Sequence, residues 1–142
     1  MNYGSILALD VGEVRIGTAI SDPTQTLATP NKTIPRHNAI KHIANMVVVH
    51  DIQYILVGIP YLPSGEKGTQ VMRTESFIKQ LAMKINLPIA SIDERFSSIE
   101  AINKINSTNH KPKSKKLKKL RDSVDSAAAA IFLQAHLEKK VP

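Results

Sequence analysis

Three acidic side chains have little local reason to be where they are: Asp10, Glu94 and Asp125. Asp10 interrupts the apolar run of residues 6–11, which is long enough to form a buried central strand. Glu94 follows another apolar run, and Asp125 falls in the first turn of an alanine-rich helical pattern. Because an unpaired carboxylate is costly to bury, Asp10 needs a cation, a hydrogen-bond donor or a metal ion as its partner.

Carboxylates on separate elements can act together when the fold brings them to one place. They repel one another unless a cation neutralises them, and Mg²⁺ suits this role because it binds oxygen ligands, usually one or two carboxylates with waters and substrate phosphates. Two such ions about 3.5 to 4 Å apart can activate a water and stabilise the leaving oxygen of a phosphodiester displacement. We therefore predict a site for Mg²⁺ or Mn²⁺, with two ions, at Asp10, Glu94 and Asp125.

Each of the three acids also has an ordinary interpretation. Asp10 can be a turn residue, and Glu94 can form a surface ion pair with Arg95, which would be worth little. Asp125 can be a helix-start acid that interacts favourably with the helix dipole. Taken singly, Glu94 and Asp125 fit these interpretations, and only the combination of the three favours a metal site.

The positive charge of the chain is concentrated in one short segment. The net charge is +7, and residues 111–121 contain seven cations and no acid, so the rest of the chain is neutral overall. Such a segment is typical of a protein that binds a polyanion, here nucleic acid. A solvated charged loop is the alternative. The cations of this basic segment are Lys111, Lys113, Lys115, Lys116, Lys118, Lys119 and Arg121.

The apolar pattern predicts an alternation of strands and helices. Short apolar or alternating runs predict strands at residues 6–11, 15–21, 27–34, 54–58 and 87–92. Helical spacing predicts helices at residues 38–49, 69–85 and about 123–137, with a short helix from about 97 to 105. Helices between the later strands indicate an α/β fold.

Local features of this pattern refine the arrangement. The first two strands are joined by three residues, which implies a hairpin, and Pro30 makes the third strand an edge strand. Gly17 and Ala19 leave one face of the second strand shallow enough for another backbone or a ligand. Residues at about 106–121 have little apolar content and are predicted to form an exposed, mobile loop that carries the basic segment.

Composition excludes several classes of function. The 142 residues, 42% of them hydrophobic, predict one domain spanning residues 1–142. The absence of cysteine excludes disulfides, thiolate zinc sites and a cysteine nucleophile, and the five histidines have no zinc-binding spacing. No run approaches the ~18 apolar residues of a membrane span, so we predict a soluble cytoplasmic protein with no membrane partner.

Four sequence blocks follow one another along the chain: LALDVGEVRIGTAISD (7–22), VGIPYLPSGEKGTQ (57–70), IDERFSS (92–98) and VDSAAAAIFLQAHLE (124–138). In this order and spacing they resemble the signature blocks of the YqgF-type family. Each block alone is weakly specific, whereas the four together are highly specific and span nearly the whole chain. The family is a small bacterial RNase H-like group, described as Holliday-junction-resolvase-like and as nucleases that process the end of pre-16S ribosomal RNA. The loop at residues 58–65 departs from the family's usual GLPLNMDG, because it has no acid before its glycine.

The resemblance implies an RNase H-like α/β fold, with a mixed five-stranded sheet ordered 3-2-1-4-5 and helices on both faces. It implies metal-dependent hydrolysis of phosphodiester bonds by Asp10, Glu94 and Asp125, with water as the nucleophile. Arg15 and Arg95 occupy the family's basic positions, where they would contact phosphate or orient the acids. The implied substrate is structured nucleic acid, most directly the pre-16S rRNA end, with ribosomal precursor particles among the partners.

Three other functions stay open on the sequence. A Holliday-junction-resolvase-like DNA endonuclease would use the same acids, and a non-catalytic nucleic-acid-binding module of the same fold would use only the basic segment. A phosphotransferase of the actin and sugar-kinase kind would use residues 7–22, but those proteins need two such domains around a cleft. A basic loop reads phosphate and not sugar, so the sequence does not distinguish RNA from DNA, and it does not indicate an oligomeric state.

Overall fold

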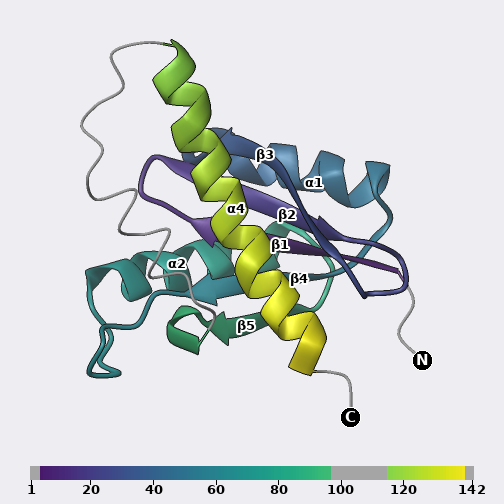
Figure 1. Ribbon diagram of the computed structural model, residues 1–142. Coiled ribbons are helices and arrows are strands. Elements are labelled where there is room, and N and C mark those ends of the chain that lie inside the picture. The colour runs from purple at the N-terminus through teal and green to yellow at the C-terminus, as the bar shows by residue number, and fades with distance from the viewer. Residues whose placement is uncertain (1–3, 97–114, 140–142) are drawn as a thin grey trace.

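The computed structural model describes residues 4–96 and 115–139, and a five-stranded sheet forms its centre (Figure 1). The sheet order is β3-β2-β1-β4-β5. The pairs β1–β2 and β2–β3 are antiparallel, whereas β1–β4 and β4–β5 are parallel. The predicted order and the predicted hairpin are therefore confirmed. The strands are β1 (Ser5–Val11), β2 (Arg15–Ser21), β3 (Ala28–Pro35), β4 (Ile52–Ile59) and β5 (Ile89–Asp93).

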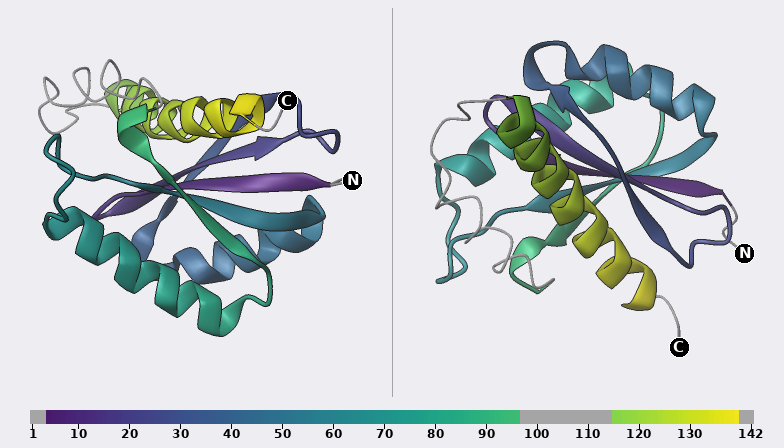
Figure 2. Two further views of the ribbon diagram at one scale, coloured as in Figure 1. Left: turned by 90° about the horizontal axis from the view of Figure 1, so that it is seen from below. Right: turned by 45° about the horizontal axis from the view of Figure 1, so that its top comes forward.

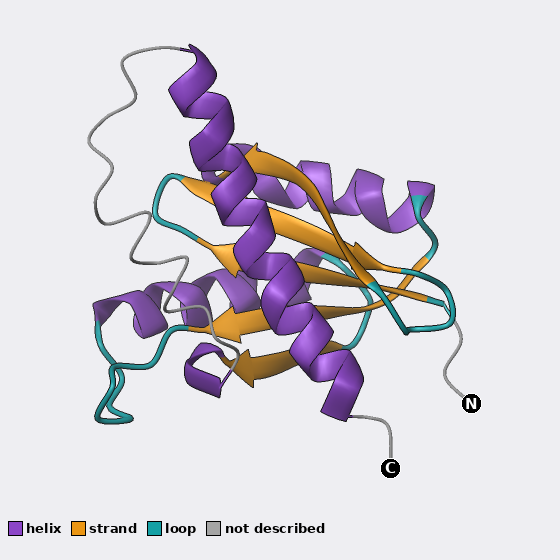
Figure 3. Cartoon of the chain, viewed as in Figure 1, coloured by secondary structure: helices purple, strands orange, loops and turns teal. Residues whose placement is uncertain are grey.

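Helices cover both faces of this sheet. Figure 2 shows α1 and α2 on one face and α4 on the other, and in Figures 1 and 3 α4 crosses the strands diagonally. Within residues 4–96 and 115–139, no helix is both long and apolar enough to cross a membrane. The helices are η1 (Arg36–Asn38), α1 (Ala39–Val49), α2 (Thr69–Lys84), η2 (Glu94–Phe96) and α4 (Lys115–Lys139).

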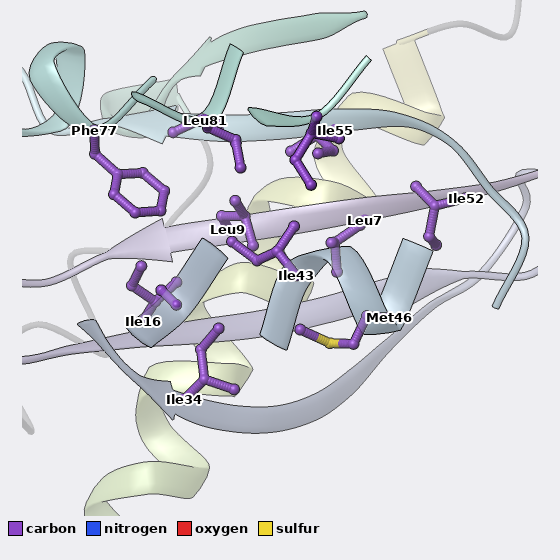
Figure 4. Packing of buried hydrophobic residues seen from close by; sticks show 13 residues of the cluster. Leu7, Leu9, Ile16, Ile34, Ile43, Met46, Ile52, Ile55, Phe77 and Leu81 are labelled. Carbon is purple, nitrogen blue, oxygen red and sulfur yellow. The ribbon is translucent and has the colours of Figure 1, made fainter. Parts of the chain in front are cut away.

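The strands divide the core into two layers because their side chains alternate between the two faces. Leu7 and Leu9 of β1 pack with the apolar side chains of α1 and α2, as Figure 4 shows. Ile6 and Ala8 point the other way and pack with apolar side chains of α4. The sheet is thus buried on both sides at its centre, which explains the unbroken apolar runs in the sequence.

The edge position predicted for the third strand is also correct. β3 pairs only with β2 in the sheet order, and Pro30 lies opposite Ala19. The register shifts between Gly17 and Ala19, next to this proline. An irregular edge strand accommodates a proline because no further strand needs its missing N–H group.

The last helix begins earlier than the sequence pattern indicated. It was expected from about residue 123, but α4 begins at Lys115, so the predicted loop of about 106–121 is wrong from residue 115 onward. Lysine, leucine and arginine are good helix formers, and a helix that is already packed can extend through them without a new nucleus. The first part of that loop and the short helix expected at about 97–105 lie outside the described residues.

Candidate active site

Strand alternation directs Asp10 toward the α4 side of the sheet. Ile6 and Ala8, which share this face of β1, are fully buried beneath α4. Asp10 is the next residue on the same face and lies near the end of the strand, where it is only partly buried. It therefore lies at the border between the apolar core and solvent. The ordinary interpretation of Asp10 as a turn residue is wrong, because Asp10 is part of β1.

A glycine opposite Asp10 allows α4 to bring Asp125 to the same place. Gly17 of β2 pairs with Asp10, and a Cβ atom at Gly17 would lie 2.2 Å from the backbone oxygen of Asp125. The helix backbone thus rests directly on the strand. The expectation that Gly17 leaves room for a backbone or a ligand is resolved in favour of a backbone.

A second glycine makes room for Glu94. Gly58, near the end of β4, precedes Ile59, which pairs with Asp93 on β5. A Cβ atom at Gly58 would lie 2.6 Å from Oε1 of Glu94 and 2.7 Å from the ring of Phe132 on α4. The sequence pattern did not indicate a role for Gly58, although its position two residues after the buried Leu56 places it on the α4 face.

Asp10 and Glu94 form a close carboxyl pair. Their side chains are hydrogen-bonded to each other, which requires a proton on one of them. Burial, followed by repulsion from Asp10, raises the pKa of Glu94 to about 9. Burial raises the pKa of Asp10 to about 6, with a further contribution from the charge of Asp125. The pair therefore carries less than two negative charges at neutral pH unless a cation lies beside it.

Asp125 is near this pair but is bonded elsewhere. Its Oδ2 atom accepts a hydrogen bond from Nε of Arg15 at 2.5 Å, and both side chains are largely screened from solvent. Asp125 still lies close enough to Asp10 to raise its pKa. The three acids thus reach the same end of the sheet, but no group of three or more acidic or histidine side chains in the described part of the chain is arranged as a metal-binding cluster.

A small pocket opens between Asp10 and Asp125. Its volume is about 140 Å³, and the β1–β2 turn supplies most of its wall. Arg15 provides a positive charge at this pocket, as expected from its position in the sequence. The lining residues are Asp10, Gly12, Glu13, Val14, Arg15 and Asp125.

The other predicted basic residues are Arg95, which does not line this pocket, and the basic segment. Arg95 lies beside the site, but its guanidinium forms an ion pair with Asp93, with 2.6 Å between Nη2 and Oδ2. The part of the basic segment from Lys115 to Arg121 forms the first turns of α4, directly before Asp125 on the same helix. Lys111 and Lys113 lie outside the described residues.

Solved structures with a similar backbone include RuvC of Thermus thermophilus. The structure titled "T. thermophilus RuvC in complex with Holliday junction substrate" has a TM-score of 0.55 and 10% identity, covering 97% of this chain and 96% of that chain. A second structure of T. thermophilus RuvC has a TM-score of 0.52 and 9% identity, covering 94% of this chain and 96% of that one. Together with the strand order, this likeness shows that the fold is RNase H-like.

Similarity in sequence extends over nearly the whole chain. A protein of Chloroflexus aggregans named "Putative pre-16S rRNA nuclease" is 38% identical over 143 residues, which cover 99% of this chain and 97% of that protein. A protein of the same name from Fusobacterium nucleatum is 39% identical and covers 94% and 96%. The family model RuvX, described as Holliday junction resolvase, matches residues 4–139. On these matches, the chain belongs to the RuvX family.

Proposed function

We propose that this chain is a metal-dependent nuclease that hydrolyses phosphodiester bonds in structured nucleic acid, most directly at the end of pre-16S rRNA. The observation that carries the proposal is the convergence of Asp10, Glu94 and Asp125 at one end of the sheet, beside Arg15. These acids come from β1, the turn after β5, and α4. Membership of a nuclease family supports the proposal.

The carboxyl pair of Asp10 and Glu94 fits a divalent cation. Both groups offer oxygen ligands, and burial raises the pKa of each carboxyl group. Mg²⁺ or Mn²⁺ would be held by one or both of these carboxylates, with Asp125 contributing when Arg15 releases it. When bound, the metal would supply Lewis-acid activation of water and of the phosphodiester. Two ions remain our proposal for the count.

In this proposal, Arg15 and the basic first turns of α4 bind the substrate. Arg15 faces the pocket and balances negative charge there, whether it belongs to Asp125 or to a phosphate of the substrate. The first turns of α4 carry Lys115, Lys116, Lys118, Lys119 and Arg121. At about 1.5 Å of rise per residue, this part of the helix lies between ~6 Å and ~15 Å from Asp125 along the axis, so it would hold the nucleic acid backbone next to the acids.

Cleavage of a pre-16S rRNA fragment tests the function directly. We expect the purified chain to cut this RNA with Mg²⁺ or Mn²⁺ and to lose the activity on chelation. We expect Asp10→Asn to reduce kcat by at least about 100-fold while RNA binding is retained. Cleavage by Asp10→Asn at the wild-type rate would overturn the mechanism. If the wild-type chain binds the RNA but gives no metal-dependent cleavage product, the chain is a nucleic-acid-binding module and not a nuclease.

A four-way DNA junction is the second candidate substrate. The description of the family model as Holliday junction resolvase favours it. Matched RNA and DNA junctions, each incubated with wild type and Asp10→Asn, distinguish the two substrates, because only the true substrate should be cut by wild type alone. We place the reaction in the cytoplasm on ribosomal precursor particles if RNA is the substrate. If the purified chain does not bind ATP, the phosphotransferase alternative is excluded.

A further inference from the structure

The guanidinium group of Arg95 forms an ion pair with Asp93, two residues earlier in the chain. The guanidinium Nε atom donates to both carboxylate oxygens of Asp93 at 3.1 Å, and Nη2 donates to Oδ2 at 2.6 Å. The arginine holds the pKa of Asp93 below its usual value, because the hydrogen bond favours the ionised carboxylate. Such a planar arrangement of two groups is specific to arginine and cannot be reproduced by lysine.

The same aspartate fixes the turn that carries Glu94. Asp93 is the last residue of β5 and pairs with Ile59, so its backbone is anchored in the sheet. Its Oδ1 atom also accepts a hydrogen bond from the backbone N–H of Arg95 at 3.0 Å. Glu94 lies between these two residues at the start of the 3₁₀ turn η2, so the residue before it is held by the sheet and the residue after it by the Asp93 carboxylate.

Arg95 also reaches the loop of residues 60–68, which joins β4 to α2. Its guanidinium carbon lies 5.5 Å from the centre of the Tyr61 ring, and Nη1 donates to the backbone oxygen of Pro63 at 3.4 Å. Within the loop, the backbone N–H of Leu62 donates to the oxygen of Glu66 at 3.1 Å. The arginine thus connects the turn that carries Glu94 to a loop that has its own internal structure.

We propose that Arg95 is a positioning residue, which holds Glu94 and the loop of residues 60–68 in place through Asp93 and Tyr61, and that it does not bind substrate phosphate. The proposal rests on the proposed nuclease function for its effect on the reaction. The side chain of Glu94 sits against Gly58 of β4, two residues before this loop, and Arg95 follows Glu94 directly, so a shift of Arg95 with the loop would move the carboxylate out of reach of Asp10. A displacement of about 1 Å at a reacting centre can cost ~100-fold in rate.

Trypsin cleavage at Lys67 tests the positioning role without any activity measurement. Lys67 lies in the loop, and its side chain is 58% exposed. We expect Arg95→Gln to accelerate cleavage there about tenfold, because proteolysis follows the open population of the loop. Tyr61→Leu should also accelerate it while leaving the charge of Arg95 in place, and it serves as the test if Arg95→Gln fails to fold. Unchanged cleavage in both variants would overturn the proposal.

Kinetics and binding separate a positioning residue from a phosphate contact. We expect Arg95→Gln to lower kcat by about tenfold to 100-fold, with KM within about twofold of wild type. Arg95→Lys should not restore kcat. A phosphate contact would instead raise KM and reduce the slope of log affinity against log salt by about 0.9. That result would overturn the proposal.

The Asp93→Asn variant sharpens this distinction. It removes the partner of Arg95 and leaves the arginine charge available, so nucleic acid would bind more tightly if Arg95 contacted phosphate. We expect instead a loss of kcat like that of Arg95→Gln, and a double variant that is no slower than either single variant, because the two residues act as one unit. Tighter binding with unchanged kcat would contradict us.

Lys79→Gln is the matched control. It removes one positive charge from an exposed position on α2, on the opposite face of the sheet from α4, and should leave trypsin cleavage, kcat and the salt slope unchanged. If the wild-type chain cleaves no nucleic acid, the nuclease function fails, whereas the trypsin experiment still decides whether Arg95 holds the loop. The two failures are therefore distinguishable.

Discussion

Asp10 and Glu94 resist ionising together, and this property links the stability of the protein to the proposed chemistry. Burial raises both pKa values, and repulsion from Asp10 raises that of Glu94 further, so the negative charge that a cation would neutralise costs the folded chain free energy. Arg15 relieves the same repulsion at Asp125, which it pairs with directly. We therefore expect a cation beside the carboxyl pair to stabilise the folded chain.

In a chelating buffer, we expect stability to fall as pH rises. Between the ordinary carboxyl pKa values and about 9, the folded chain binds more protons than the unfolded chain, so the free energy of unfolding decreases with pH. Glu94→Gln removes much of this dependence and should be more stable than wild type at about pH 8, by on the order of 2 kcal/mol. Urea denaturation at several pH values measures the difference.

The difference in the free energy of unfolding between wild type and Glu94→Gln should shrink toward about pH 4.5. At this pH, Glu94 is protonated in the folded chain and half-protonated in the unfolded chain. Glu138→Gln, at an exposed position near the end of α4, is the control and should follow wild type at every pH. Parallel profiles for wild type and Glu94→Gln would contradict a raised pKa for Glu94. Added Mg²⁺ should stabilise wild type at high pH and have a smaller effect on Glu94→Gln.

At the scale of elements, the contact between α4 and β2 sets the position of Asp125. The helix backbone reaches the strand because residue 17 has no side chain. Ala128 and Ala129 of α4 are buried on the sheet, and Gln134 bonds to the backbone of Ala28 at the edge. Small side chains at this interface let the helix lie close, so Asp125 can approach Asp10.

We expect Gly17→Ala to push α4 away from β2. The new Cβ atom would meet the backbone oxygen and carbon of Asp125 at 2.2 and 2.5 Å, and backbone atoms cannot rotate aside. Overpacking of this kind costs about 1 to 3 kcal/mol, and the proposed nuclease activity should fall by more than the loss of folded protein explains. Thermal denaturation and the cleavage assay, compared at a temperature where both proteins are folded, measure the two effects.

Gly68→Ala is the control for this substitution. Its Cβ atom would meet only side-chain atoms of Leu62, at 3.3 to 3.4 Å, and these can move by a few tenths of an ångström. The variant should therefore be within about 0.5 kcal/mol of wild type. Equal stability and equal activity of Gly17→Ala and Gly68→Ala would show that the close helix contact does not position Asp125.

At the scale of the whole molecule, charge is distributed unevenly around the sheet. The first turns of α4 carry most of the basic segment, whereas α1 and α2 cover the opposite face. The remainder of the chain is electrically balanced. We therefore expect a polyanion to be attracted to the side of the molecule on which α4 lies.

We expect this asymmetry to appear in the salt dependence of binding. Replacing Lys116, Lys118 and Lys119 by glutamine should reduce the slope of log affinity against log salt by about 2 to 3, because each lost phosphate contact removes ~0.9 for duplex substrates. Fluorescence anisotropy with labelled substrate, in an Asp10→Asn background that prevents cleavage, measures the slope.

A charge-matched variant on the other face completes the experiment. Lys41, Lys79 and Lys84 are exposed on α1 and α2, and their replacement by glutamine removes the same number of charges. We expect the slope of this variant to stay close to that of Asp10→Asn alone. Equal reductions in the two triple variants would mean that net charge, and not the basic segment, drives binding.

Periodicity in the sequence determined most of the elements. The apolar runs and their spacing located all five strands and the helices α1 and α2 to within a few residues, because burial on one or both faces leaves a direct pattern. The pattern did not predict the start of α4 at Lys115, because the first turns of this helix have too little apolar content to show a helical face. The resemblance of the four sequence blocks to the YqgF-type family implied the sheet order, which is confirmed, whereas the role of the three acids as metal ligands stays a prediction.

The contacts inside the site were decided only by the tertiary structure. Arg15 and Asp125 are 110 residues apart, and their pairing depends on how α4 lies on β2, which Gly17 permits. The sequence likewise left open whether Arg95 contacts phosphate or orients the acids, and it did not indicate the contacts of Arg95 with Asp93 and Tyr61. A sequence pattern reports which face of an element is buried, but not the register between distant elements, and that register determines which charged side chains meet.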